Sequence, residues 1–263
     1  MSNYLKIICY LCPSIPYDLF NAFADELSRI LSVKVDIDYD PTSSGPMDND
    51  TVLRNYDLAF VCSPSYLSLI KCPNNTMELL EMNFVYEDDR NPKKECIYFS
   101  DIMVNDPHVT MDNFHEKNLI FGYNDLSSLS GYYSMIQGLN KMDKDMSVFS
   151  AIIQTGSHLQ SIESLRKGEI NIASIDSICL KNFMVDLLKI GYFGPNPIQP
   201  ILINSKSKFK NVIYDALMRI DISKLRPYGV IEIKHMDASL YEEERILLET
   251  INKRTKTENH TES

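Results

Sequence analysis

Small hydroxyl residues stand in a turn directly before an expected helix. The turn spans residues 124–131, Asn-Asp-Leu-Ser-Ser-Leu-Ser-Gly, and follows an apolar segment typical of a strand. The first N–H groups of a helix lack partners within the helix and carry the positive end of its dipole, so they attract anions. Ser128 and Ser130 would add hydroxyl donors to such a site. Taken alone, the turn is better explained as a helix cap, because Ser, Asp and Asn precede helices of every kind.

A second turn has the same form. Residues 155–158, Thr-Gly-Ser-His, follow another strand-like segment and place His158 at the start of a helix. A neutral imidazole there can donate one hydrogen bond to a ligand oxygen, and its protonation would make affinity depend on pH. A surface histidine beside a helix cap is the alternative. Asp176 ends a third strand-like run and is either a helix cap or an acceptor for a ligand amine or hydroxyl.

These residues favour binding over catalysis, and we predict no catalytic residue. Ser157 and His158 are adjacent, and adjacent side chains at a helix start point apart, so adjacency does not make them a nucleophile and base pair. A single histidine without an orienting partner rarely suffices for catalysis. An enzyme on the same scaffold is the first alternative, and a protein-interaction module that has lost its ligand is the second.

Alternating strand and helix patterns position these turns. A strand at 4–11, a helix with apolar residues at helical spacing from Leu19 to Leu31, and a strand at 33–38 predict a β-α-β opening with parallel strands. Residues 57–62 predict a near-continuous apolar strand of the kind that is buried on both faces of a parallel sheet. The apolar stretches 83–86 and 96–105 flank a charged loop, which predicts an antiparallel pair leading out of a first lobe.

The middle of the chain repeats the alternation and predicts a second α/β unit. Its strands are expected at 119–123, 150–155 and 171–175, and its helices at 130–139, 159–167 and 177–185. Residues 194–200 are rich in Pro and resist regular structure, after which a strand at 201–204 and a helix at 208–220 return to the first lobe. A helical pattern covers 241–253, and the polar residues 254–263 predict a disordered tail.

The expected lobes follow from these elements. The first lobe is predicted to comprise residues 1–103 and 192–253, and the second residues 104–191. The chain would then cross between the lobes twice, which predicts a hinge.

Composition and charge narrow the class of partner. The chain has 263 residues, of which 44% are hydrophobic, and a formal net charge of −10. An acidic protein is not expected to bind nucleic acid or anionic membranes, because both need basic surface. No segment approaches the ~20 apolar residues of a membrane-spanning helix, and the apolar run from Ile7 to Cys12 is too short for a secretion signal. These patterns predict a cytoplasmic chain.

The cysteines agree with that location. Six of them are scattered along the chain, several within expected buried strands. Reduced thiols in the core are the expected state. Cys9 and Cys12 have the spacing of a metal-binding or redox pair, but no second pair completes a zinc site, so no metal is predicted.

Taken in order, the motifs resemble those of the phosphonate-binding-protein-like branch of the type 2 periplasmic binding proteins. Tyr56 and Asp57 give the acidic strand start, and residues 125–131 fit D/N-x-x-S-x-S-G. Residues 155–158 fit the TGSH turn with Ser161 shortly after, and residues 168–176 fit G-x-x-x-x-A-x-x-D. The resemblance covers roughly residues 4–220, and the combination is far more specific than any one motif.

The resemblance implies a two-lobed α/β fold, in which each lobe is a mostly parallel sheet flanked by helices and the lobes close on a small anion. A phosphonate, a phosphate ester or phosphite is the implied ligand. Asp176 would accept a hydrogen bond from an amino or hydroxyl group of that ligand. The other ligand-binding residues implied are Ser128, Leu129 through its N–H, Ser130, Ser157 and His158 from the second lobe, and Tyr10, Ser14, Ser63 and Tyr66 from the first.

The resemblance also bears on partners. A small anionic ligand is the partner expected of a monomer without cofactor or metal. Importer-associated relatives are secreted or lipid-anchored, and the start of this sequence shows neither pattern, so an ABC permease is a doubtful partner. The enzyme alternative would be similar to a pyrimidine synthase for thiamine formation, a relative that uses a histidine and a cysteine-rich motif.

Overall fold

A β-α-β unit opens the chain, as the sequence predicts. The computed structural model describes residues 4–47, 51–183 and 186–250. In it β1 (Tyr4–Cys9) leads through α1 (Tyr17–Leu31) to β2 (Lys34–Tyr39), and the two strands pair in parallel with Tyr4 opposite Lys34. The helix buries a stripe that includes Leu19, Phe23 and Leu27, because apolar residues recur on one face at helical spacing.

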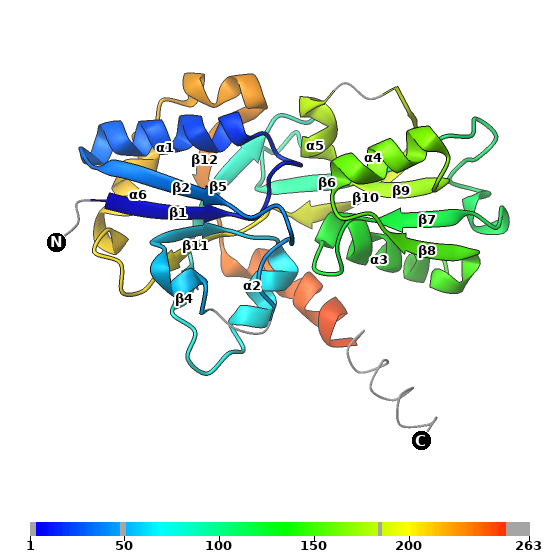
Figure 1. Ribbon diagram of the computed structural model, residues 1–263, viewed down its shortest axis with the longest axis horizontal. Coiled ribbons are helices and arrows are strands. Elements are labelled where there is room, and N and C mark those ends of the chain that lie inside the picture. The colour runs from blue at the N-terminus through cyan, green and yellow to red at the C-terminus, as the bar shows by residue number, and fades with distance from the viewer. Residues whose placement is uncertain (1–3, 48–50, 184–185, 251–263) are drawn as a thin grey trace.

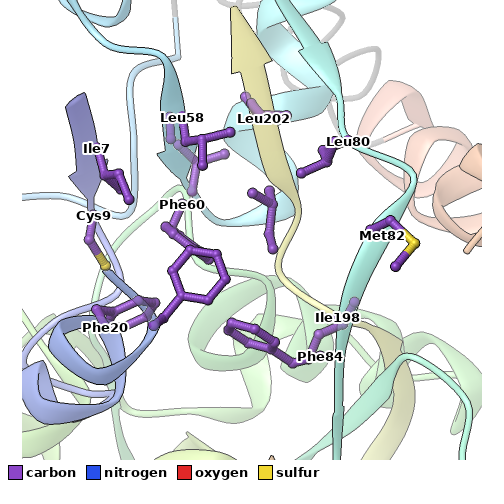
Figure 2. Packing of buried hydrophobic residues seen from close by; sticks show 14 of the residues in the cluster. Ile7, Cys9, Phe20, Leu58, Phe60, Leu80, Met82, Phe84, Ile198 and Leu202 are labelled. Atoms are coloured by element: carbon purple, nitrogen blue, oxygen red, sulfur yellow. The ribbon is translucent and has the colours of Figure 1, made fainter. Parts of the chain in front are cut away.

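The first lobe is built on a five-stranded sheet with the order β2-β1-β3-β11-β4 (Figure 1). Its other elements are β3 (Leu58–Phe60), α2 (Ser63–Leu69), β4 (Met77–Leu79), β11 (Ile201–Asn204) and α6 (Lys210–Met218). Figure 2 shows how the side chains of its core gather from distant segments, with Phe20 of α1 against Phe60 of β3 at 4.9 Å between ring centroids. Phe84, which follows β4 in the chain, packs against the same cluster.

The second lobe is built on another five-stranded sheet, with the order β10-β6-β9-β7-β8. Its elements are β6 (Ile97–Val104), β7 (Ile120–Tyr123), α3 (Ser134–Lys141), β8 (Ala151–Gln154), α4 (His158–Lys167), β9 (Ile172–Asp176), α5 (Ser177–Asn182) and β10 (Leu188–Pro197). Both faces of this sheet are covered. Ile102 and Phe121 belong to the core on one face, and Met103 and Ile175 belong to the core on the other.

Both sheets are mixed. In the described residues of each, two strand pairs are parallel and two are antiparallel. The parallel pairs come from the β-α-β segments that the sequence predicts. Each antiparallel pair includes β6, β10 or β11, the strands at which the chain enters or leaves a lobe.

Two expectations about the connecting segments are wrong. The stretches 83–86 and 96–105 do not pair with each other, because β5 (Met82–Tyr86) pairs with β12 (Val230–His235) while β6 lies in the second sheet. Residues 194–197 are regular after all and form the end of β10. Its prolines are tolerated because β10 is an edge strand and its register with β6 shifts between Phe193 and Asn196.

The strands show where the chain changes lobes. It crosses between β5 and β6, and again through residues 198–200 between β10 and β11. The predicted divisions at 103/104 and 191/192 therefore fall inside β6 and β10, two strands of the second sheet. The predicted tail, residues 254–263, lies outside the described residues. Near the end of the chain a helix runs from Glu242 through residue 250, the last described position (Figure 1).

Membrane insertion and thiol state were also predicted from sequence. Within the described ranges, none of the helices combines the length and the apolar character that crossing a bilayer requires. All six cysteines are free thiols. The Cys9 and Cys12 sulfurs lie 3.9 Å apart and both residues are buried.

Candidate ligand-binding site

A small cavity between the lobes gathers polar side chains from both of them. Its volume is about 40 Å³, enough for roughly three water molecules. Its first-lobe wall is Tyr10, Leu11, Ser14, Ile15, Ser44 and Cys62, its second-lobe wall is Asn124, Ser128, Ser130, His158 and Asp176, and Gln199 comes from the crossing at 198–200.

The first-lobe wall stands at the carboxyl ends of β1 and β3. These strands are parallel neighbours, so the residues that follow them meet at one edge of the sheet. The Tyr10 N–H donates to the Phe60 carbonyl at 2.9 Å, which prolongs the pairing by one residue and fixes the chain at the cavity. Burial raises the pKa of Tyr10 to about 12, so its hydroxyl keeps its proton at neutral pH.

The serine-rich turn supplies the opposite wall and is also a cap. Ser128 Oγ accepts from the Gly131 N–H at 3.1 Å, at the start of a five-residue π-helical turn, Leu129–Tyr133. A Cβ at position 131 would overlap Asn124 Oδ1, so this close turn requires glycine. Ser128 therefore caps the turn and also lines the cavity. The sequence left open whether this turn is a helix cap or part of a site, and the structure shows that it can be both.

His158 and Ser130 form the central pair of this wall. His158 Nε2 lies 3.0 Å from Ser130 Oγ, and the Ser130 backbone is held by a hydrogen bond from Ser174 Oγ to its carbonyl at 2.5 Å. His158 Nδ1 is buried and has no hydrogen-bond partner in the described part of the chain. Burial lowers the pKa of His158 to about 3. The imidazole is therefore neutral at physiological pH, and the pH dependence expected from its protonation is not found at this residue.

Asp176 is the titratable group of the cavity instead. It is 3% exposed, caps α5 by accepting from the Ile178 N–H at 2.7 Å, and accepts from Gln199 Nε2 at 2.5 Å. Burial raises its pKa to about 7, against the opposing effect of these hydrogen bonds. Its charge therefore changes near neutral pH. Asp176, like Ser128, therefore caps a helix and lines the cavity at the same time.

Two first-lobe residues predicted for the site lie outside the cavity lining. Ser63 Oγ donates to Glu244 Oε1 at 2.9 Å, and the ring of Tyr66 packs edge-on against Tyr241 with centroids 5.3 Å apart. Both predicted residues are buried against the C-terminal helix region rather than facing the second lobe.

Two second-lobe residues predicted for the site are also absent from the lining. The Leu129 N–H, expected to hold the anion, donates to Cys62 Sγ at 3.3 Å across the cleft. Ser157 Oγ accepts from the Gln160 N–H at 3.2 Å and so caps α4. The structure thus brings together six of the predicted residues, namely Tyr10, Ser14, Ser128, Ser130, His158 and Asp176.

Several lining residues were not singled out from the sequence as ligand contacts. Gln199 stands in the proline-rich stretch that was expected to be irregular, and Ser44 lies in a loop between β2 and β3. Cys62 was expected only as a core thiol. Nothing in their local sequence marks them, because it is the strand order that brings β3 and the 198–200 crossing to the cavity.

The cavity offers neutral donors rather than cations. Neither lysine nor arginine occurs among the described residues that line it. The hydroxyls of Ser14 and Ser44 can donate hydrogen bonds, and so can the protonated form of Asp176. Ser130 and the neutral His158 are bonded to each other, which leaves that pair one donor for a ligand. In a buried site such donors can bind an oxyanion without a countercharge.

Solved structures similar to this one are solute-binding proteins. The binding-protein component of an ABC phosphonate transporter from Pseudomonas aeruginosa matches with a TM-score of 0.78 at 15% identity, over 98% of this chain and 89% of that one. PhnD1 from Prochlorococcus marinus in complex with methylphosphonate matches with a TM-score of 0.74 at 15% identity, over 95% of this chain and 99% of that one. The periplasmic aliphatic sulphonate binding protein SsuA from Escherichia coli matches with a TM-score of 0.55 at 11% identity, over 97% of this chain and 88% of that one.

The chain has the fold of the type 2 periplasmic solute-binding proteins. The resemblance inferred from the turns and their spacing is thereby confirmed at the level of fold. No family model matches the sequence, and neither does any curated protein. The motifs and the three-dimensional likeness therefore agree where overall sequence comparison finds nothing.

Proposed function

We propose that this protein binds a small oxyanion, of the phosphonate or phosphate-ester class, between its two lobes and does not transform it. The observation that carries the proposal is the convergence of Ser14, Ser44, Ser130 and His158 on one cavity from both lobes. The similar structures include a phosphonate transporter component and a methylphosphonate complex, which supports this ligand class.

The size of the cavity supports a small head group. A volume of about 40 Å³ holds roughly three oxygen-sized atoms, which suits the three oxygens of a phosphonate. A larger substituent on the ligand would need the lobes to close less completely. The lining is also polar enough to replace the hydration of such an anion, with donors on opposite sides.

The donor set supports binding rather than catalysis. His158 contacts Ser130 but has no described partner on Nδ1 to orient it as a base. Asp176, the other titratable group, already accepts hydrogen bonds from Ile178 and Gln199. These contacts fix side chains in place for recognition.

The cellular location and a transporter partner stay predictions. The cytoplasmic location was expected from the sequence, whereas one similar structure is described as periplasmic. We keep a monomeric binding protein as the proposal, with an ABC permease as an untested partner.

Calorimetric titration of the full chain tests the proposal. Methylphosphonate, phosphite, ethyl phosphate and acetate would be titrated into the wild type, and we expect binding of at least one phosphorus oxyanion. His158→Ala should weaken that binding by about tenfold or more, because a hydrogen bond to a charged group contributes about 1.5–3 kcal/mol. His108→Ala, at an exposed position, is the matched control. Absence of heat with all four anions, or equal affinity in His158→Ala, would sink the proposal.

A further inference from the structure

A second cavity lies between the C-terminal helix and the second lobe, and it shares no lining residue with the cavity at Ser130 and His158, here called the oxyanion cavity. Its volume is about 300 Å³, at the lower end of the roughly 300–1,000 Å³ typical of small-molecule pockets. The helix that begins at Glu242 forms one side, and the end of β10 with the start of β6 forms the other. In Figure 1 this orange-red helix runs beneath the junction of the lobes.

The side chains of this cavity are of two kinds. Apolar surface comes from Leu129 and Pro197 of the second lobe and from Leu240 and Leu247 of the C-terminal segment. Carboxyl groups come from Glu95, Glu243 and Glu244, and neither lysine nor arginine occurs among the described lining residues. Among the residues that the structure describes, Glu95 and Glu243 form no ion pair. The cavity is therefore both apolar and negative.

Glu244 is the buried member of the three. It is 4% exposed, and its Oε1 accepts from Ser63 Oγ at 2.9 Å. Its Oε2 is buried and has no hydrogen-bond partner among the described residues. A buried polar atom without a partner is unfavourable, so a group that donates to Oε2 would be stabilised there.

We propose that this cavity binds an organic cation, an ammonium group on a short apolar chain. The ammonium group donates up to three hydrogen bonds and is attracted by three carboxyl groups, of which Glu244 offers the atom without a partner. The apolar chain packs against the leucines and Pro197 of the lining. Such a ligand touches both lobes and does not compete for the oxyanion cavity.

Binding of this cation is expected to release a proton. Burial raises the pKa of Glu244 to about 8, so its carboxyl group is mostly protonated at pH 7. The titratable groups around it, Cys62, Tyr98, Tyr133 and Tyr241, have raised pKa values and are neutral at that pH. Glu95 and Glu243 line the same cavity and add to the negative field. A bound ammonium group favours the ionised form of Glu244 and therefore displaces its proton.

Titration of n-hexylammonium into the full chain at pH 7 tests the proposal, with n-hexanol and n-hexanoate as matched probes. We expect hexylammonium to bind at one site, hexanol more weakly and hexanoate not at all. Repeating the titration in two buffers of different ionisation heat should show proton release in the wild type and none in Glu244→Gln. Affinity for hexylammonium should fall by about tenfold or more in Glu244→Gln, since removal of one partner of a buried charge pair is strongly unfavourable.

Further variants separate this site from its surroundings. Glu242→Gln, on the same helix but paired with Arg245, should leave hexylammonium affinity unchanged. Leu240→Trp should block the cavity while keeping every carboxylate, and it carries the test if Glu244→Gln does not fold. His158→Ala should have no effect, which keeps this site distinct from the oxyanion site. The proposal is overturned if folded wild type does not bind hexylammonium, if hexanoate binds equally, or if Leu240→Trp binds as the wild type does.

Discussion

At the scale of single residues, Asp176 shows how burial turns a helix cap into a titratable group. An exposed capping carboxylate would be ionised at pH 7. Here the same side chain is 3% exposed, and its pKa is raised to about 7 in spite of the hydrogen bonds that it accepts. Burial therefore outweighs the hydrogen bonds. The group is neutral in acid and charged in mild alkali, in a cavity that we propose for anions.

Asp176→Asn should change how stability depends on pH. The folded pKa lies above the unfolded value, so the wild type loses stability as pH rises from about 4 to about 7, and an amide does not. Between pH 4 and 8 the wild type should lose up to about 4 kcal/mol relative to the variant, since one pKa unit corresponds to about 1.4 kcal/mol. Asparagine caps helices as well as aspartate does, so α5 is kept.

Urea unfolding at pH 4, 6 and 8 measures this difference directly. Asp112→Asn, at an exposed position, is the control and should follow the wild type at each pH. If wild type and Asp176→Asn stay parallel across the range, the carboxyl group is ionised throughout and the assignment of its pKa is wrong.

Contacts in space decide which of the predicted site residues line the cavity. Ser128, Ser130, His158 and Asp176 follow the strands of one sheet, so local pattern alone placed them at one edge. Ser63 and Tyr66 lie outside the lining because the C-terminal helix region covers α2, a contact across more than 170 residues of sequence. The residues around α2 give no indication that a segment so far along the chain packs against it.

At the scale of elements, α3 can approach β10 closely because Gly138 of the helix lies against the strand. A Cβ at position 138 would overlap the ring of Phe193, a residue of β10. Gly138→Ala should gain about 1 kcal/mol in helix propensity. Overpacking of the helix against the strand should outweigh that gain and give a net loss of about 1–2 kcal/mol.

Thermal and urea unfolding of Gly138→Ala check the balance of these effects. Asn140→Ala, on the exposed side of the same helix, should be neutral or slightly stabilising and isolates the propensity effect. A Gly138→Ala protein more stable than the wild type would show that Phe193 moves aside without penalty, so that the close approach is not a constraint.

Elements with strong local periodicity were predictable, and elements defined by distant pairing were not. The buried face of α1 and the parallel register of β1 with β2 follow from residue spacing within 40 positions. The partner of β5 is β12, about 150 residues later, and β10 is a strand because β6 lies beside it. The spacing of apolar residues predicts that a segment is a helix or a strand, whereas contacts between distant segments decide which strands pair.

At the scale of the whole molecule, Gln199 holds the two lobes together at the shorter crossing. Its side chain donates to Asp176 of the second lobe at 2.5 Å, and its carbonyl accepts from Asn83 Nδ2, next to the first sheet, at 2.9 Å. The residue is buried and lines the oxyanion cavity. The side chain and the backbone carbonyl of one residue thus connect the two lobes beside the cavity between them.

Gln199→Ala should open the molecule. Its loss leaves the Asp176 carboxyl with one donor fewer and removes a hydrogen bond between the crossing and the second lobe. The population should shift toward open forms, and methylphosphonate affinity should fall because binding must then supply the free energy of closure. Small-angle scattering should report a larger radius of gyration for the free variant, and saturating methylphosphonate should bring it back toward the wild-type value.

The control for this prediction is Gln160→Ala, which replaces an exposed glutamine on α4 and should leave scattering and affinity unchanged. If Gln199→Ala scatters and binds as the wild type does, the Gln199 side chain does not control closure.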